Sequence, residues 1–280
     1  MTDWSRFDAL IRAALDEDLA AAGDLTSHAV VDDAVTSGGQ LVARERGTIA
    51  GLPLAERVFA TVDGRIATSA RVADGDPVEA GTPLAIVEGP SRGVLAAERT
   101  ALNFLGRMSG IATATADLVR RVEGTGARIA DTRKTTPTLR SLEKYAVRMG
   151  GGLNHRFGLY DAVMIKDNHI VAAGGVVPAV ERARSRVGHT VKIEVEVETL
   201  DQLSELLSVG ADIVLLDNMG LDDLRAAVAL VDGAMVTEAS GGITPDTVRA
   251  VAETGVDVIS VGWITHSAPT LDVALDFRPS

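Results

Sequence analysis

The fold is decided by residues 191–262, which read VKIEVEVETLDQLSELLSVGADIVLLDNMGLDDLRAAVALVDGAMVTEASGGITPDTVRAVAETGVDVISVG. Apolar, β-branched runs begin at positions 191, 212, 234 and 257, so they recur every 21 to 23 residues. The segments between them, such as 221–231, carry apolar residues at helical spacing. Short strands that alternate with helices are typical of repeated βα units and predict a parallel sheet.

Two further strands are predicted earlier in the chain, at 128–131 (RIAD) and 162–167 (AVMIKD). About six βα units favour an α/β fold in which parallel strands form an incomplete barrel, since a complete barrel has eight units. An open doubly wound sheet is the alternative architecture. No GxGxxG sequence follows a predicted strand, and this disfavours the alternative.

The chain before the first of these strands follows a different pattern. Residues 3–22 predict a helix that Gly23 ends, and residues 95–122 predict a long helix. Between them, β-rich runs are separated by turn sequences. The runs lie at 40–45, 65–72 and 83–89. The stretch 72–90 resembles the half-barrel hairpins of biotinyl and lipoyl carrier domains, but it lacks the lysine that those domains modify.

Composition limits the possible functions. The 280 residues carry a formal net charge of −12 and 3% aromatic residues, which disfavours a nucleic-acid partner. Cysteine is absent, so disulfides and thiolate chemistry are excluded. No run approaches the ~20 apolar residues of a membrane span. The opening residues MTDWSRFDAL lack the pattern of a signal peptide, so we expect a cytoplasmic protein with no membrane partner.

Positive charge is concentrated in one region of this acidic chain. Residues 92–166 hold 13 Lys and Arg against 6 Asp and Glu. A basic pocket in an acidic protein suits a small anion with several charges. We expect Arg120, Arg121 and Lys144 on solvated helix faces rather than in that pocket.

Cationic side chains also follow two predicted strands, at the end where barrels of this class carry their working residues. Including the connecting loop, they are Arg133, Lys134, His155, Arg156 and Lys166. Arginine binds carboxylates through two parallel hydrogen bonds. A substrate with two adjacent carboxylates would match this set.

Acidic residues form a second group of candidates. Glu194, Glu196 and Glu198 alternate along one strand and therefore share a face, which we predict to be the barrel interior. Buried carboxylates need partners, and basic side chains or a hydrated cation could supply them. The next predicted strand ends in Asp217.

Two glycine-containing loops follow the last two predicted strands. Gly241 and Gly242 precede a helix that we expect to begin near Pro245, and residues 261–263 precede another short helix. Backbone N–H groups at helix N-termini bind phosphate, and the last two βα loops of barrels often serve this purpose. The sequence therefore predicts a phosphate site.

Seven motifs in the chain resemble the quinolinate phosphoribosyltransferase family. They are AERTALN (97–103), DTRKTTP (131–137), GGLNHRFGLYD (151–161), IKDNH (165–169), EVEVE (194–198), LDNM (216–219) and EASGGI (238–243). These motifs are long and keep the family's order, and the likeness runs nearly end to end along the chain.

The resemblance implies a two-domain fold. An N-terminal α/β sandwich domain would occupy residues 1–109 and be completed by the tail 267–280, and the barrel domain would occupy 110–266. It also implies a homodimer, open to further assembly, with its active site at the subunit interface. Arg99 would then reach the quinolinate pocket of the neighbouring subunit.

The resemblance further implies roles for individual residues. The quinolinate-binding positions are Arg99, Arg133, Lys134, His155, Arg156 and Lys166, and Thr132 joins the substrate-binding set. Glu196 and Asp217 match the acidic pair that holds the ribose hydroxyls and Mg²⁺. The loops around the 5-phosphate comprise Ser240, Gly241, Gly242, Val261, Gly262 and Trp263, with His266 nearby.

The implied reaction joins quinolinate to phosphoribosyl pyrophosphate and releases pyrophosphate and CO₂, giving nicotinate mononucleotide for NAD biosynthesis. Mg²⁺ would neutralise the leaving pyrophosphate. Glu196 and Asp217 would stabilise positive charge on the ribose. The catalytic set is completed by Lys134 and Lys166, either of which could act near the 2-carboxylate.

Three other functions stay open from the sequence. A Schiff-base aldolase could use Lys166 as its nucleophile. A related phosphoribosyltransferase could act on another pyridine such as nicotinate, although the basic cluster favours a dicarboxylate. A carrier or binding module built on residues 72–90 is the non-enzymatic alternative, and its missing lysine disfavours it.

Overall fold

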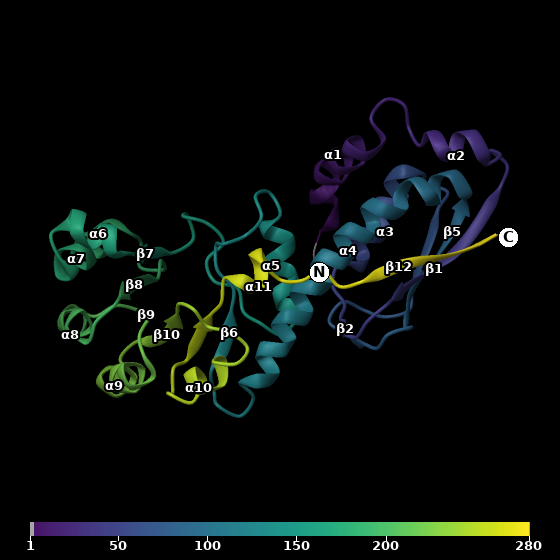
Figure 1. Cartoon of the computed structure of the whole chain (residues 1–280). Coiled ribbons are helices and arrows are strands. Elements are labelled where there is room, and N and C mark those ends of the chain that lie inside the picture. The colour runs from purple at the N-terminus through teal and green to yellow at the C-terminus, as the bar shows by residue number, and fades with distance from the viewer. Residues whose placement is uncertain (1–2, 280) are drawn as a thin grey trace. The chain divides into compact units, whose positions relative to one another are not determined.

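The computed structural model describes residues 3–279, which form two compact units (Figure 1). One unit contains the residues up to Ala114 together with those from Ala268. The other unit is Thr115–Ser267. The divide at residue 114 falls within the long helix α4 (Ser91–Arg121).

The second unit is built on a six-stranded parallel sheet with strand order β6-β11-β10-β9-β8-β7. The strands are β6 (Arg128–Ala130), β7 (Val163–Ile165), β8 (Ile193–Val197), β9 (Ile213–Asp217), β10 (Val236–Ser240) and β11 (Val258–Ser260). Within residues 3–279, β6 and β7 are not paired with each other. The prediction of an incomplete barrel of about six parallel strands is confirmed.

Helices alternate with these strands, and Figure 1 shows α7, α8 and α9 outside them. The helices are α5 (Arg140–Met149), α6 (Asp167–Ala173), α7 (Val176–Arg186), α8 (Leu200–Val209), α9 (Leu221–Val231), α10 (Val248–Ala252) and α11 (Trp263–His266). Helices α7, α8, α9 and α10 each bury apolar side chains and contact barrel strands, so the polar interior of the barrel is left to the other strand face.

Strand β8 shows how the sequence pattern divides the two faces. Val195 and Val197 are fully buried on the face that α7 and α8 contact. Glu194 and Glu196 alternate with them and line interior cavities. Glu198 lies beyond the end of the strand and is exposed, and its N–H donates to Gln202 at 2.8 Å. The prediction that all three acidic residues share the interior is therefore wrong for Glu198.

Two predicted helix boundaries are also wrong. The helix expected near Pro245 begins only at Val248, because Thr244 and Thr247 hold a turn in which the Thr244 N–H donates to the Thr247 hydroxyl. The N-terminal helix does not extend to Gly23, since α1 (Asp8–Leu19) stops where Ala20 adopts a positive φ of 44°.

The first unit contains a four-stranded antiparallel sheet with order β12-β1-β5-β3, and a separate β2-β4 pair. The strands are β1 (Thr36–Ala43), β2 (Gly47–Thr48), β3 (Ala67–Ala70), β4 (Pro77–Val78), β5 (Pro83–Pro90) and β12 (Val273–Pro279). Its helices, besides α1 and most of α4, are η1 (Trp4–Phe7), α2 (Leu25–Val30) and α3 (Leu52–Val62). Strand β12 follows the barrel in the chain and pairs with β1.

Among residues 3–279, no helix has both the length and the apolar character that crossing a membrane would require.

Candidate active site at the carboxyl end of the barrel

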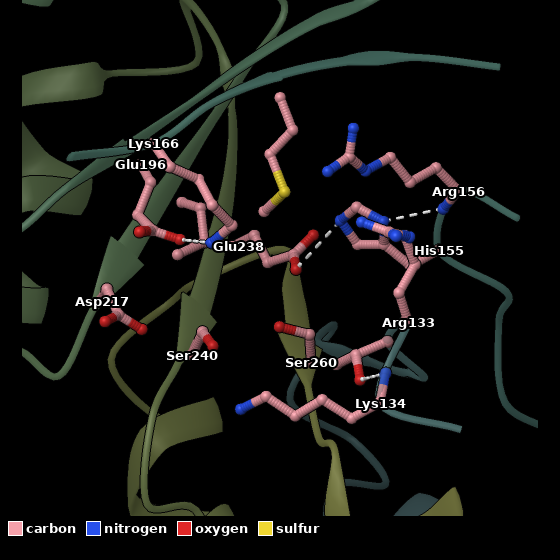
Figure 2. Close-up of a pocket in the computed structure, with 13 residues that line it drawn as sticks. Arg133, Lys134, His155, Arg156, Lys166, Glu196, Asp217, Glu238, Ser240 and Ser260 are labelled. Carbon is pink, nitrogen blue, oxygen red and sulfur yellow. Dashed lines mark hydrogen bonds and ion pairs between the residues drawn. The ribbon is translucent and has the colours of Figure 1, made fainter. Parts of the chain in front are cut away.

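A cavity of about 410 Å³ opens at the carboxyl ends of the barrel strands (Figure 2). Its lining residues are Thr132, Arg133, Lys134, His155, Arg156, Met164, Lys166, Glu196, Leu215, Asp217, Glu238, Ser240 and Ser260. Most come from the six strands or from the loops that follow them, and His155 and Arg156 come from the loop between α5 and β7. Nine of them belong to the site predicted from the sequence, and Met164, Leu215, Glu238 and Ser260 do not.

The two arginines of the cavity lack a full set of partners. Among the described residues, the buried Nε atoms of Arg133 and Arg156 have no hydrogen-bond partner. Burial lowers the pKa of the Arg156 guanidinium, and the positive charge of Arg133 lowers it further. Buried donors in native proteins are normally satisfied, so these two cations form a site suited to an anion.

An ion pair lies across the cavity from these arginines, between Lys166 and Glu196 (Figure 2). Asp217 lies nearby on the next strand and accepts a hydrogen bond of 2.7 Å from the Asn218 amide. The arrangement brings two carboxylates and a lysine to the same wall of the cavity. Carboxylate oxygens there can accept hydrogen bonds from hydroxyl groups or bind a hard cation.

The glycine loops predicted to hold phosphate lie close by but do not line the cavity. Gly241 and Gly242 have positive φ angles of 101° and 61°. A Cβ atom at Gly262 would lie 2.9 Å from Lys134 Cδ and 3.5 Å from His266 Nε2, so this loop packs against the cavity wall.

Other members of the predicted phosphate set link the two loops. Val261 is buried, and the Trp263 indole N–H donates to the carbonyl of Ile243 at 3.0 Å. His266 Nδ1 lies 2.6 Å from the Ser267 hydroxyl. Arg99, the predicted contribution from a neighbouring subunit, is exposed on α4 in the other compact unit.

Beneath the cavity mouth, three titratable side chains meet inside the barrel. His155 Nε2 lies 3.1 Å from a carboxylate oxygen of Glu194 and 3.6 Å from one of Glu238. The N–H of Arg156 donates to His155 Nδ1 at 2.7 Å, so the proton of a neutral ring is on Nε2 and points to Glu194. Both ring nitrogens are therefore engaged within the protein.

Glu238 is the residue of this cluster that sequence reasoning missed. It is 4% exposed, and burial raises its pKa to about 7, with a further contribution from the negative charge of Glu194. Its oxygen Oε1 has no hydrogen-bond partner among residues 3–279. One signal was available, because Glu238 precedes Ser240 by two positions and so shares its interior face.

A buried ion pair holds the loop that carries His155 and Arg156. Lys144 and Asp131 are both fully buried and bonded to each other, and Lys144 also donates to the His155 carbonyl at 2.9 Å. Asp131 accepts from the His155 N–H at 2.8 Å and from the Asn154 amide at 2.6 Å. The expectation that Lys144 lies on a solvated face is wrong, since α5 turns this side toward the barrel carboxylate.

The burial of this ion pair shifts both pKa values. Burial raises the pKa of Asp131 although Lys144 acts in the opposite direction, and burial lowers the pKa of Lys144 although Asp131 opposes it. Each charge thus depends on the other for its stability.

A second carboxylate orders the loop that carries Arg133 and Lys134. Glu143 on α5 is buried and accepts from the Thr136 N–H at 3.0 Å and from the Thr136 hydroxyl at 2.8 Å. Arg140 on the same helix donates to the carbonyl of Phe157 at 2.9 Å. Helix α5 therefore positions both basic loops of the site.

Comparisons with known proteins identify the family of the chain. Residues 24–109 match the family model "Quinolinate phosphoribosyl transferase, N-terminal domain", and residues 111–276 match the corresponding C-terminal domain model. The chain is 45% identical to the probable nicotinate-nucleotide pyrophosphorylase [carboxylating] of Bacillus subtilis, covering 91% of this chain and 88% of that protein. It is also 45% identical to the Mycobacterium leprae nicotinate-nucleotide pyrophosphorylase [carboxylating], covering 95% of each.

A solved structure shows the same fold over the whole chain. The crystal structure of NadC from Streptococcus pyogenes superposes with a TM-score of 0.96 at 39% identity, covering 100% of this chain and 99% of that one. Family models match both units of the chain, and the relatives are of nearly equal length, so the family assignment covers the whole chain. The chain belongs to the quinolinate phosphoribosyltransferase family.

Proposed function

We propose that this chain is a carboxylating nicotinate-nucleotide pyrophosphorylase. It transfers the phosphoribosyl group of phosphoribosyl pyrophosphate to the nitrogen of quinolinate and releases pyrophosphate and CO₂, which yields nicotinate mononucleotide. The observation that supports this most directly is the cavity itself. Two arginines with unpartnered Nε atoms and two carboxylates, Glu196 and Asp217, line opposite parts of it.

The basic side of the cavity suits quinolinate. Arg133 and Arg156 would bind its adjacent carboxylates, Thr132 and Lys134 complete this side of the pocket, and Lys166 faces it from the opposite wall. We assign His155 to positioning, because its ring bonds to the Arg156 N–H and to Glu194. Nicotinate has one carboxylate and would leave part of the positive charge unpaired, which favours the dicarboxylate.

The acidic side suits the ribose and a divalent cation. Carboxylate oxygens are the ligands that Mg²⁺ prefers, and it is commonly bound by one or two carboxylates together with phosphate groups. Glu196 and Asp217 fit that description because both line one wall of the cavity. When bound, Mg²⁺ would offset the negative charge of the departing pyrophosphate.

During transfer, this chain's own residues position and stabilise the reacting groups. The carboxylates of Glu196 and Asp217 stabilise the positive charge that develops on the ribose as the bond to pyrophosphate breaks. The arginines hold the quinolinate nitrogen toward that carbon. The Ser240–Gly242 and Val261–Trp263 loops, with His266, would bind the 5-phosphate through backbone N–H groups.

The proposal includes a homodimer in which Arg99 of a second copy completes the quinolinate pocket. The exposure of Arg99 on helix α4 supports this role, because its guanidinium is accessible to a second copy of the chain. The proposal also places the protein in the cytoplasm, whereas relatives from Nicotiana tabacum and Oryza sativa are named as mitochondrial and chloroplastic.

The test is a direct assay of the purified full-length chain. Quinolinate labelled at the 2-carboxylate should release labelled CO₂ and an equal amount of pyrophosphate, only when phosphoribosyl pyrophosphate and Mg²⁺ are present. Nicotinate should release little pyrophosphate. Release of pyrophosphate with nicotinate alone would assign the chain to the other pyridine.

The aldolase alternative is disfavoured by the ion pair at the cavity. A Schiff base needs the lysine nitrogen as a free amine, and Lys166 is bonded to Glu196. Borohydride in the presence of a carbonyl substrate should therefore leave no covalent adduct on Lys166, as mass spectrometry of a digest would show.

A further inference from the structure

We propose that Glu238 is the acid that delivers a proton to C2 of the pyridine ring once CO₂ has left. This assignment rests on the proposed function and extends it to a step for which no residue has been named above.

Loss of the 2-carboxylate requires a proton donor. The bond between C2 and the carboxylate carbon breaks, CO₂ departs, and the electron pair stays on C2 beside the cationic ring nitrogen. A new C2–H bond must then form, and the proton must come from an acid at the ring edge. If that acid is Glu238, its carboxylic acid becomes a carboxylate and the atoms and charges balance.

Most other polar groups around the cavity are poor candidates. Arg133 and Arg156 retain their protons in proteins. Lys134 and Lys166 are weaker acids than a carboxylic acid, and Lys166 is engaged by Glu196. Glu196 is already bonded to Lys166. Among the residues that line the cavity, Glu238 is the carboxyl group whose surroundings favour the neutral acid.

The position of Glu238 fits the role. Figure 2 shows its carboxyl group between the Lys166–Glu196 pair on one side and His155 on the other, and Glu238 lines the cavity. The side chain is 4% exposed, and Oε1 has no hydrogen-bond partner in the described part of the chain. An acid held there is shielded from solvent, and its Oε1, 3.6 Å from His155 Nε2, makes no hydrogen bond with the described residues.

Burial and four polar or charged groups from neighbouring elements set the protonation state of Glu238. Glu194 on β8 and Asp131 after β6 favour the neutral acid through their negative charge. His155 on the loop after α5 and the Ser260 hydroxyl on β11 oppose them. Burial and Glu194 outweigh these two, so the pKa rises to about 7. A dianionic substrate in the same cavity would favour the neutral acid further.

A second cavity provides a route by which the proton can be replaced. It has a volume of about 370 Å³ and shares His155, Arg156 and Glu238 with the first. Its other lining residues include Lys192, Ile213 and Val258, which lie at the beginnings of the barrel strands rather than at their ends. Glu238 thus borders both cavities and can be reprotonated from the side away from the substrate.

The experiment compares pyrophosphate release with CO₂ release in single turnovers of the full-length Glu238→Gln variant. Phosphoribosyl transfer precedes decarboxylation, so pyrophosphate should appear within about threefold of the wild-type rate. CO₂ release should fall at least about 100-fold, the range expected for loss of a general acid. A mononucleotide that keeps both carboxylates should accumulate to the enzyme concentration.

Two further variants separate proton donation from structural support. Glu238→Asp retains an acid and should recover part of the CO₂ rate. Glu194→Gln leaves the donor in place, so pyrophosphate and CO₂ should remain coupled, while the loss of kcat at high pH should begin at a lower pH because Glu194 raises the pKa of Glu238. The Glu238→Gln variant should lack that decline altogether.

Each remaining outcome counts against the assignment. Equal loss of pyrophosphate and CO₂ release in Glu238→Gln would indicate structural damage to the site, and a CO₂ rate within threefold of wild type would remove Glu238 from the chemistry. If the wild-type chain released no pyrophosphate when given quinolinate and phosphoribosyl pyrophosphate together, the proposed function would be refuted instead. Failure of the Glu238 assignment and failure of the proposed function therefore give different results.

Discussion

Arg133 and Lys144 are basic residues from the same part of the chain, and their surroundings give them different tasks. Lys144 is fully buried and bonded to Asp131, so its charge is already balanced within the protein. Arg133 lines the cavity with a buried Nε atom that has no partner among residues 3–279. The sequence predicts Arg133 in the pocket and Lys144 on a solvated helix face, and only the packing reveals that Lys144 is a buried structural cation.

Replacing Arg133 should separate the two substrates. In Arg133→Ala we expect quinolinate affinity to fall by about 10- to 100-fold, since hydrogen bonds to charged groups contribute about 1.5–3 kcal/mol. The affinity for phosphoribosyl pyrophosphate should stay within threefold. Isothermal titration of each ligand measures this, with Arg120→Ala on the exposed face of α4 as the matched control. Similar losses for both ligands would contradict the division of the cavity.

Glu238 should make the stability of the protein depend on pH. Its folded-state pKa of about 7 lies above the ordinary value of 4.5, so folding favours the neutral acid. This contribution is present in full below about pH 4.5 and is lost as the pH rises to about 7, amounting to about 3 kcal/mol. Urea unfolding should show wild type losing stability relative to Glu238→Gln over that interval. A difference that does not change with pH would rule out the raised pKa.

At the scale of elements, the strands were predictable and their loops were not. Alternation along β8 and the 21–23-residue repeat give the strands within a few residues because both reflect which face is buried. The helix expected near Pro245 failed because two threonine side chains hold a turn, a local choice that periodicity does not record. Glu238 was missed for a related reason, since its role depends on His155 and Glu194 from other elements.

Helix α5 should depend strongly on its buried lysine. In Lys144→Met, Asp131 would keep a buried charge without its cation, and we expect a loss of about 3–5 kcal/mol in the free energy of unfolding. Lys192→Met is the matched control, because Lys192 is 68% exposed in its pair with Asp212 and should cost about 0.2–1 kcal/mol. Urea denaturation compares them, and equal losses would contradict the anchoring role of Lys144.

The two glycines after β10 offer a paired test of the loop. Both have positive φ, so alanine at either position costs about 1–2 kcal/mol of backbone strain. A Cβ atom at Gly241 would also overlap the Asn218 side chain and lie 3.0 Å from its backbone nitrogen, whereas one at Gly242 would meet no described atom within 4 Å. Gly241→Ala should therefore weaken phosphoribosyl pyrophosphate binding more than Gly242→Ala, as measured by titration. Identical affinities would show that the loop does not support the site.

At the scale of the whole molecule, one unit is continuous in the sequence and the other is not, because its last segment follows the barrel unit in the chain. The βα repeat predicted the six-stranded unit because it is continuous in the sequence. The antiparallel sheet of the other unit was harder to derive, since its strands are not evenly spaced in the sequence and its edge strand comes from beyond residue 267. Only the family resemblance indicated that the tail belongs there.

The pairing of β12 with β1 has a consequence for biosynthesis. Strand β1 leaves the ribosome early, yet the neighbour that covers one of its edges is translated only after the whole barrel. Until then, the backbone N–H and C=O groups along that edge are open to other chains. The barrel unit can complete its sheet during translation, whereas the sheet that contains β1 stays incomplete until β12 has been synthesised. The open edge of β1 is therefore the part of the nascent chain most prone to aggregation.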